Sequence, residues 1–346
     1  MKTIIILLVT FISFSCSHQQ AVIKAKSKLD THPVGTLSYW NWVKEYNLET
    51  KISSSFNDEI SEYLNLWKKV YSLEKKTNYY PSEIEAHNFE HVFRYAVLSF
   101  PREYKMRINK HIKSLYLVRG LGISTLAIQL KEFEKENSQQ FVVFMDIDVL
   151  NQKINDWYKW REETAFKKSN SYKLKPYLSH ENTVIDTVHY SLFQLYGIIL
   201  NWNPKYYPTN NKELLSKFSD YKLLNSSWKL EHDIVTPKFS SLPEDLNYLR
   251  YYTKDDILFS TEDMLKFYRS LEGSNFPNLY AFSSSSKDFI ESIASYLYTE
   301  KLEKPFSIDI AKDGKIVGSY DSCWQQTRCL NKKKEIEKIL DLEKLD

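Results

Sequence analysis

The sequence is poor in glycine and cysteine, and it lacks both a basic stripe and a long apolar run. Seven glycines in 346 residues argue against the glycine-rich loops that bind nucleotide phosphates. Lysine and glutamate are mixed along the chain and leave a net charge of +3, so we expect no nucleic-acid partner. After the first 15 residues, no stretch approaches the roughly 20 apolar residues that cross a bilayer. The hydrophobic content of 42% and the aromatic content of 15% are typical of a folded globular protein.

The N-terminus has the order of features that is typical of a secretory signal. Lys2 is followed by an apolar stretch over residues 4–12, and small residues such as Ser13 precede Cys16. This stretch is too short for a stable transmembrane helix. A cysteine directly after the cleavage region is typical of a bacterial lipoprotein signal, although Ser13 stands where leucine is usual. The alternative is ordinary cleavage nearby, which would release a soluble secreted protein.

The lipoprotein interpretation assigns three parts of the chain. Residues 1–15 are the signal peptide, Cys16 is the lipid-bearing first residue of the mature protein, and the polar residues 16–36 are a linker between lipid and fold. We therefore expect a protein of the bacterial cell envelope that contacts the membrane through its lipid anchor alone. Ser17 is not the aspartate that retains lipoproteins, which favours the outer membrane, facing the periplasm.

Two further cysteines form an isolated pair near the C-terminus. Cys323 and Cys329 are six residues apart. In an oxidising periplasm, such a pair most simply forms a local disulfide. Two thiols without a nearby histidine make a poor metal site, so we expect the disulfide.

Hydrophobic periodicity predicts a mostly helical α+β fold with one small sheet. Helical patterns cover parts of residues 37–76, and then residues 82–98, 182–200, 261–271, 287–299 and 332–345. Strand-like runs cover residues 114–121, 141–150 and 306–310, and residues 173–178 have an extended pattern. The pattern at 126–133 fits either a third strand or an extension of a helix. Residues 201–256 carry four prolines and have an irregular pattern. We divide the mature chain into a domain over residues 37–330, whose first part to about 110 is helical, and a charged C-terminal helix over 331–346.

Two segments resemble the zincin-type zinc metallopeptidases of bacteria. Residues 155–197 read NDWYKWREETAFKKSNSYKLKPYLSHENTVIDTVHYSLFQLYG, and residues 276–310 read FPNLYAFSSSSKDFIESIASYLYTEKLEKPFSIDI. The first is similar to the region that leads into the HExxH zinc helix of those proteins. The second is similar to the later helix that supplies an acidic zinc ligand. The resemblance extends over roughly residues 90–330 and implies a zincin-like scaffold.

The same resemblance implies a degenerate zinc site. In the family, two histidines at i and i+4 and a later acid bind zinc, and the glutamate after the first histidine is the general base. Here His189 takes the first ligand position and Glu291 the third, with Asp288 one turn before it, whereas Tyr190 replaces the general base and Phe193 the second histidine. One imidazole and one carboxylate do not hold zinc tightly. We therefore expect no cofactor, with zinc as the candidate if a residual site remains, and an inactive enzyme with a binding or structural role.

Several alternatives stay open. An active peptidase would need His189, Glu291 and a further ligand such as His232. In the first interpretation, a peptide or an envelope protein would bind in a tyrosine-lined groove between the His189 helix and the Glu291 helix. A structural lipoprotein without any ligand would have His189 as an ordinary core residue.

A second histidine pattern competes with the first. His87 and His91 form an HxxEH sequence of the inverzincin type. Its third ligand would have to be a residue such as Glu162 or Glu163, which nothing in the sequence singles out. We therefore expect His87 and His91 to lie on an ordinary helix face.

Overall fold

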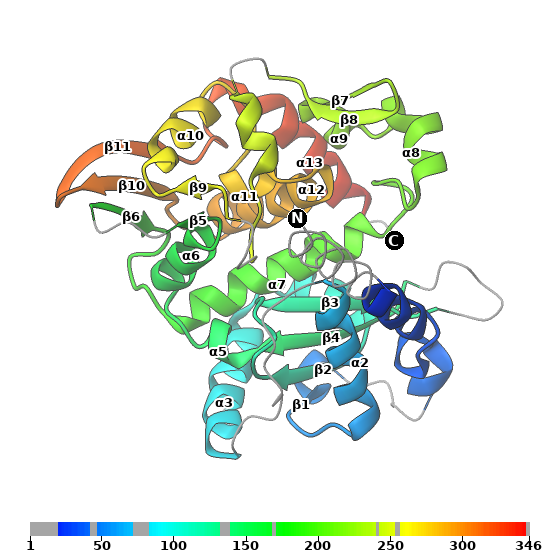
Figure 1. Cartoon of the computed structure of the whole chain (residues 1–346). Helices are drawn as coiled ribbons and strands as arrows, with labels where there is room; N and C mark the ends of the chain where they lie inside the picture. Colours follow the sequence, from blue (N-terminus) through cyan, green and yellow to red (C-terminus); the bar gives the residue numbers. More distant parts are fainter. Residues whose placement is uncertain are drawn as a thin grey trace, which may run out of the picture.

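The computed structural model describes residues 20–41, 47–71, 83–131, 139–167, 171–239, 242–252 and 257–343 (Figure 1), with the backbone alone for residues 83–87. The predicted signal peptide (residues 1–15), the predicted lipid-bearing Cys16 and Ser17 lie outside these residues. None of the described helices is long and apolar enough to cross a membrane. Helix makes up 54% of the structure, which confirms the mostly helical α+β class. The expectation of one small sheet is wrong, because the described residues form four sheets.

The largest sheet has four strands in the order β1-β2-β4-β3. The first three strands are parallel to one another, and β3 is an antiparallel edge strand. The bounds are β1 (Ile52–Ser53), β2 (Ile112–Val118), β4 (Phe141–Asp146) and β3 (Thr125–Gln129). The predicted strand at 141–150 ends early, because the Asp146 carboxylate accepts the Asp148 amide and begins the short helix α5 (Ile147–Leu150).

Both faces of this sheet are covered, which explains why its central strands β2 and β4 are apolar without alternation. On one face, Tyr116 and Phe144 pack with Trp40 and with α2 (Asp58–Val70). The next residues along each strand, such as Leu117 and Val143, point to the opposite face. That face belongs to the larger core, which also contains residues of α3 (Glu83–Ser99) and α4 (Arg102–His111). The sequence analysis predicted a helical part to about residue 110 but did not name α4 as a separate helix.

The predicted linker differs from the structure. Residues 20–30 are helical, and Leu29 is buried in the same layer as Trp40 and α2. These residues contribute apolar side chains to the fold, so the linker interpretation of residues 16–36 does not describe them.

The helix α7 (Val184–Asn201) runs through the middle of the molecule, between the four-stranded sheet and the C-terminal half (Figure 1). It contacts α3 and α4 on one side and α12 (Ser285–Tyr296) on the other. α12 continues into a π-helical turn at Leu297–Lys301. The remaining helices of this half are α6 (Ile154–Glu163), α10 (Asp263–Leu271), α11 (Leu279–Phe282) and α13 (Leu330–Leu342).

Three smaller sheets belong to the C-terminal half. An antiparallel sheet has the order β11-β10-β6, and two-stranded sheets join β5 with β9 and β7 with β8. The bounds are β5 (Phe166–Lys167), β6 (Tyr172–Tyr177), β7 (Trp228–Glu231), β8 (Ile234–Pro237), β9 (Phe259–Ser260), β10 (Ser307–Lys312) and β11 (Lys315–Asp321). The region 201–256 therefore contains regular elements, including the short helices α8 (Asn211–Lys217) and α9 (Lys222–Ser227). Cys323 and Cys329 form the predicted disulfide, and both are buried.

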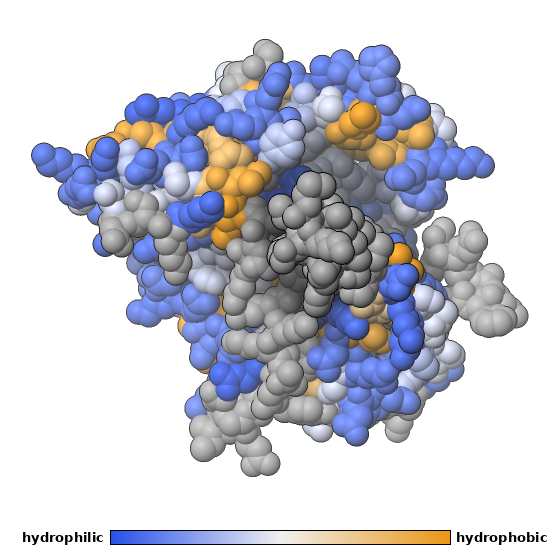
Figure 2. Space-filling model, viewed as in Figure 1, coloured by the Kyte–Doolittle hydropathy of each residue, from blue (hydrophilic) through white to orange (hydrophobic). Residues whose placement is uncertain are grey.

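Exposed apolar side chains on the face drawn in Figure 2 form separate patches on a largely hydrophilic surface. Two patches lie over the hairpins β7–β8 and β10–β11, where Ile234 and Ile316 are 62% and 57% exposed. Single exposed apolar residues are normal on a folded protein. The features that could form a functional site are therefore the buried charges and the pockets.

Candidate functional site

The helix α7 is fixed at its start by a capping box. Thr183 Oγ1 accepts a hydrogen bond from the Asp186 amide, and the Asp186 carboxylate accepts one from the Thr183 amide. Lys304 forms an ion pair with Asp186 at 3.0 Å. Because two backbone donors are satisfied and the carboxylate complements the helix dipole, the first turn of α7 is stabilised.

Further along, Gly197 allows α7 to pack closely against α12. A Cβ atom at Gly197 would lie 2.9 Å from the backbone oxygen of Ile290 and 3.1 Å from its Cα. Real Cβ atoms do not approach a carbonyl oxygen this closely, so only glycine fits at this position. The two helices are therefore near enough for short polar side chains of one to reach the other.

Two residues of α7, spaced by four, reach the same carboxylate of α12. The Tyr190 hydroxyl donates to Glu291 Oε2 at 2.9 Å, and the Gln194 amide donates to Glu291 Oε1. Asn278, the N-cap of α11, donates to Glu291 Oε2 at 2.8 Å. Residues i and i+4 share one helix face, and Gly197 continues that face at i+7 from Tyr190. The contact with α12 thus brings three neutral donors to one buried acid.

Arg161 of α6 completes the surroundings of Glu291. Its Nη1 lies 3.1 and 3.2 Å from the two Glu291 oxygens, and its Nη2 lies 3.1 Å from Glu162 Oε1. All three side chains are fully buried. Burial alone would lower the pKa of Arg161, but Glu291 and the other acidic groups around it raise the pKa well above its usual value. The guanidinium is therefore a permanent cation between two carboxylates, and we call Arg161, Glu162, Glu291, Tyr190 and Gln194 the ionic centre.

Aromatic rings enclose this centre. The Arg161 guanidinium lies 4.4 Å from the centre of the Tyr158 ring and 4.9 Å from that of Tyr280. Tyr251 and Tyr268 donate to Glu162 Oε2 at 3.0 and 2.8 Å. Burial raises the pKa of Glu162, while Arg161 and the two phenols oppose that rise. Every charged group of the ionic centre thus has a charged or hydrogen-bonding partner, as a low-dielectric site requires.

Tyr190 has the wrong environment for a general base. Burial, and then the neighbouring Glu291, raise the pKa of Tyr190 well above its usual value. The phenol stays protonated at neutral pH and donates a hydrogen bond to Glu291. It therefore acts as a hydrogen-bond donor at the position where the sequence analysis placed the general base.

His189 lies on a different side of α7 from Glu291. Its Nε2 is 2.9 Å from the Ala96 carbonyl oxygen and 3.2 Å from Ser99 Oγ, both on α3. Its ring and that of Phe193 pack against Phe100, with ring centres 5.5 and 4.7 Å apart. Burial lowers the pKa of His189, so the imidazole is neutral at pH 7. The sequence-predicted pair of His189 with Glu291 is therefore corrected: the structure surrounds His189 with α3 and Glu291 with the ionic centre.

The other candidate residues also lie apart. His232 occupies the exposed turn between β7 and β8, with φ at 50°, so it does not join His189 and Glu291 as a third ligand. Asp288 pairs with the buried Lys332 at 2.5 Å. The side chain of His87 is not among those described, and His91 is exposed on α3.

The acids weighed as a third ligand have other partners. Glu162 belongs to the ionic centre, whereas Glu163 lies 3.9 Å from Lys159 on the same helix. Within the described residues, no group of three or more His, Cys, Asp and Glu side chains is placed to hold a metal.

A pocket of about 340 Å³ opens directly beside the ionic centre. Gln194 of the ionic centre lines this pocket, and so do Tyr251 and Tyr280, which contact Glu162 and Arg161. The wall is mostly apolar, with polar groups from β3 and α12. The complete lining is Trp67, Tyr71, Ile123, Ser124, Thr125, Gln194, Ile198, Tyr251, Tyr252, Tyr280, Lys287 and Ile290. An aromatic cavity with a few convergent polar groups is the usual form of a ligand site.

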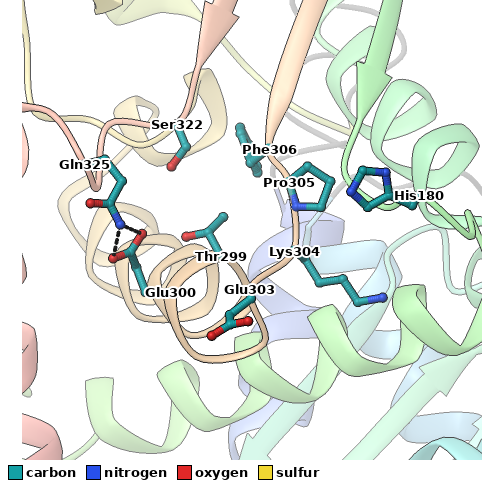
Figure 3. A pocket seen from close by; sticks show the side chains of 9 residues that line it. All are labelled: His180, Thr299, Glu300, Glu303, Lys304, Pro305, Phe306, Ser322 and Gln325. Carbon is teal, nitrogen blue, oxygen red and sulfur yellow. Dashed lines mark hydrogen bonds between the residues drawn. The ribbon is translucent and has the colours of Figure 1, made fainter.

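A second pocket, of about 500 Å³, lies at the π-helical turn and next to the disulfide segment (Figure 3). Its charged groups are already paired: Glu300 accepts from Gln325 at 2.7 Å, and Lys304 pairs with Glu181 and Asp186. Glu303 lines it from an exposed turn with φ at 53°. We therefore take the first pocket, with the ionic centre as its base, as the candidate functional site.

The sequence analysis missed Arg161, Gln194, Asn278 and Lys287 as site residues. A signal for Gln194 was present, because it follows Tyr190 by four residues and precedes Gly197 by three. No local signal connects Arg161 with Glu291, which is 130 residues away. Comparison with protein-family models, with curated proteins and with solved structures found no match.

Proposed function

We propose that this protein is a catalytically degenerate relative of the zincin metallopeptidases that binds an extended peptide without cleaving it. The observation that carries the proposal is the state of Glu291, whose two oxygens accept hydrogen bonds from Arg161, Tyr190, Gln194 and Asn278. In the zinc proteins that the sequence resembles, an acid on this later helix binds the metal together with two histidines. Here a guanidinium supplies the positive charge, and a phenol and an amide take the ligand positions.

The geometry supports this scaffold one residue later in register than the sequence suggested. Tyr190 and Gln194 have the i, i+4 spacing of two zinc-binding histidines and face Glu291. In that register, Ser191 stands at the position of the general base. Its hydroxyl is buried and has no hydrogen-bond partner, and a neutral serine is too weak a base for this role. Both the metal ligands and the base would then be lost.

A peptide has a strand edge to bind beside this pocket. β3 is at the edge of its sheet. The Asp146 N–H donates to Ser124 O, and the Leu130 N–H donates to Gln140 O, so alternate residues of β3 are hydrogen-bonded to β4. This alternation directs the backbone groups of Thr125 and Ala127 away from β4. An extended peptide adds to such an edge through main-chain hydrogen bonds and places alternate side chains in adjacent pockets. The pocket beside Thr125 is suited to accept one of them.

The proposal includes a location and a class of partner. We propose that the chain is lipid-anchored through Cys16 in the bacterial cell envelope, facing the periplasm from the outer membrane, and that its partner is a peptide or an envelope protein. The proposed binding function needs neither zinc nor another cofactor. The membrane contact would be the lipid alone, and nucleic acid would not bind.

A peptide-binding experiment tests this function. The probe is a pool of N-acetylated octapeptides of random sequence, incubated with the chain lacking residues 1–16, with bound peptides identified by affinity selection and mass spectrometry. We expect binding without cleavage, with and without added zinc. Ala127→Pro removes one outward N–H of the edge strand, a position where proline is tolerated, and should abolish binding, whereas the control Ala127→Val should retain it. Chelator-sensitive cleavage would instead support an active peptidase, and equal binding by both variants would contradict the strand-edge mode.

The scaffold is tested separately by building the metal site. In the variant Arg161→Met, Tyr190→His, Gln194→His, two histidines at i and i+4 face Glu291, and a bound zinc ion replaces the lost positive charge. We expect about one zinc per chain by elemental mass spectrometry, together with a higher melting temperature in zinc. The matched control, Arg161→Met, Phe193→His, keeps His189 and tests the register of the sequence analysis. Zinc in the control but not in the first variant would refute the proposed register.

A further inference from the structure

One charged group that lines the pocket has no ionic partner. Lys287, in the first turn of α12, points its ammonium at two rings, 4.8 Å from the centre of Tyr280 and 5.9 Å from that of Tyr251. Among the described residues, no side chain or backbone group forms an ion pair or a hydrogen bond with it. Burial, and then the neighbouring Arg250, lower the pKa of Lys287 to about 8. Within the part of the chain that the structure describes, the amine is thus held among aromatic rings without an anion in contact to stabilise its charge.

The charges nearest to Lys287 do not fill that role. Glu291 attracts it, but this carboxylate is bound by Arg161 and three neutral donors. Arg161 and Arg250 both repel it, and the Arg250 guanidinium bonds to the carbonyl oxygens of Asn247 and Leu249 rather than to an acid. Cation–π contacts are weaker than a charge-assisted hydrogen bond. The pocket therefore offers an unused donor for an anion.

A second polar group in the wall also lacks a partner. Thr125 Oγ1 is buried and forms no hydrogen bond with the described residues, and Thr125 lines the same pocket as Lys287. Buried hydroxyls are normally hydrogen-bonded. The side-chain amide of Gln194 donates a hydrogen bond to Glu291, and its carbonyl oxygen can accept one from a ligand N–H. An ammonium, a hydroxyl and an amide carbonyl thus line one pocket, and together they can bind a carboxylate and a neighbouring N–H of a peptide.

We propose that Lys287 binds a carboxylate of the peptide ligand, which comes from either the C-terminus or an acidic side chain. The proposal rests on the peptide-binding function and names the part of the ligand that the pocket recognises. A carboxylate that reaches the ammonium would replace the missing ion-pair partner, and its flanking backbone would run along the edge of β3. Lys287 is then a residue that determines which peptides bind.

Three peptide pools distinguish the two sources of the carboxylate. All are N-acetylated octapeptides: one pool without Asp and Glu but with a free C-terminus, the same pool with an amidated C-terminus, and an amidated pool that contains Glu. Binding to the wild type, Lys287→Met and Lys287→Arg is measured by affinity selection, followed by calorimetry on individual peptides. Lys212→Met is the control, because Lys212 is an exposed lysine in the first turn of α8.

We expect at least tenfold weaker binding of one carboxylate-bearing pool to Lys287→Met, partial retention by Lys287→Arg, and no change in Lys212→Met. A preference for the free C-terminus or for the Glu pool identifies the source. Equal binding of all pools to the wild type and Lys287→Met would overturn this proposal and leave peptide binding intact. If no pool binds the wild type, the proposed function itself fails.

Discussion

The ionic centre makes a quantitative prediction for Arg161→Met. This substitution keeps most of the side-chain volume but removes the cation between Glu162 and Glu291, all of which are fully buried. Breaking a buried ion pair by removing one partner costs about 3–5 kcal/mol. Protonation of one carboxylate gives a similar cost. A carboxyl with an ordinary pKa of 4.5 that must bind a proton at pH 7 costs about 3.4 kcal/mol. The remaining phenol and amide donors can hold one charge, so we expect a loss of about 3–5 kcal/mol and a melting temperature lower by roughly 10 °C.

The pH dependence separates this mechanism from simple loss of packing. Without Arg161, the pKa of at least one of the two carboxyls is raised in the folded state, so the native variant binds more protons than the unfolded chain. Its stability relative to the wild type is then highest at low pH and falls as the pH rises, by about 1.4 kcal/mol per pH unit between pH 5 and 7. Urea unfolding at both pH values, followed by tryptophan fluorescence, measures the difference.

Two controls complete this test. Lys159→Met removes a partly exposed lysine of the same helix, 3.9 Å from Glu163, and should change the stability by less than about 1 kcal/mol. The triple variant Arg161→Met, Glu162→Gln, Glu291→Gln removes the orphaned charges and should recover much of the loss. A loss below about 1 kcal/mol at pH 7, or one that is independent of pH, would refute the assignment of Arg161 as the cation that the two carboxylates require.

Three further predictions concern other parts of the fold. Burial raises the pKa of Asp146 to about 6, so its contribution to stability is greatest below about pH 4 and falls by about 3 kcal/mol as the pH rises through 6. Asp146→Asn should remove this pH dependence of the free energy of unfolding, measured by urea titrations across the range. Gly197→Ala places a Cβ atom 2.9 Å from Ile290 O and should lower the stability by about 1–3 kcal/mol in thermal unfolding; a neutral effect would contradict the close approach of α7 and α12. Cys323→Ala with Cys329→Ala opens a short loop and should cost about 2 kcal/mol, measured against the wild type with and without reductant; equal stability in all samples would contradict a formed disulfide.

Elements with strong local signals were predictable from the sequence. The helix predicted at 182–200 is α7, which starts after Thr183 because that residue and Asp186 form a capping box. The helix predicted at 287–299 is α12, whose N-cap Ser284 lies in the serine-rich turn. The disulfide followed from the spacing of two cysteines. In each case, the residues that determine the structure lie within a few positions of one another.

The orientation of α7 was not predictable from hydrophobic periodicity. Thirteen of its residues are buried, including the whole run from Asp186 to Phe193, so no single apolar face indicates which side meets α12. A shift of one residue turns a helix by about 100°. The sequence analysis chose His189 because it is a metal-binding residue type, whereas the face that contacts Glu291 carries Tyr190. The informative residue was Gly197, which marks the side of closest approach.

Contacts between distant segments account for the remaining misses. Arg161 reads as one cation in a charged segment, and its burial depends on Glu291, which lies on another helix. The sequence analysis did not predict β11. Much of this strand is exposed and it contains Gly318, so its sequence shows little of the apolar alternation that indicates a strand. Its partner strand β10 was predicted, since its apolar residues alternate with polar ones.

The ionic centre and the pocket divide two tasks that a metallopeptidase site combines. In a zinc enzyme, the acid of the later helix must be free to bind the metal, and the metal must keep an open position for water. Glu291 is instead saturated by Arg161 and by donors from two helices, so its charge stabilises the packing of α6, α7 and α12. Among the described residues, the groups that face the pocket lie outside this centre: the ammonium of Lys287, the hydroxyl of Thr125 and the edge of β3 at Thr125. In the proposed function, these groups hold a peptide. This distribution of satisfied and unsatisfied polar groups is the one that the proposed peptide-binding function requires.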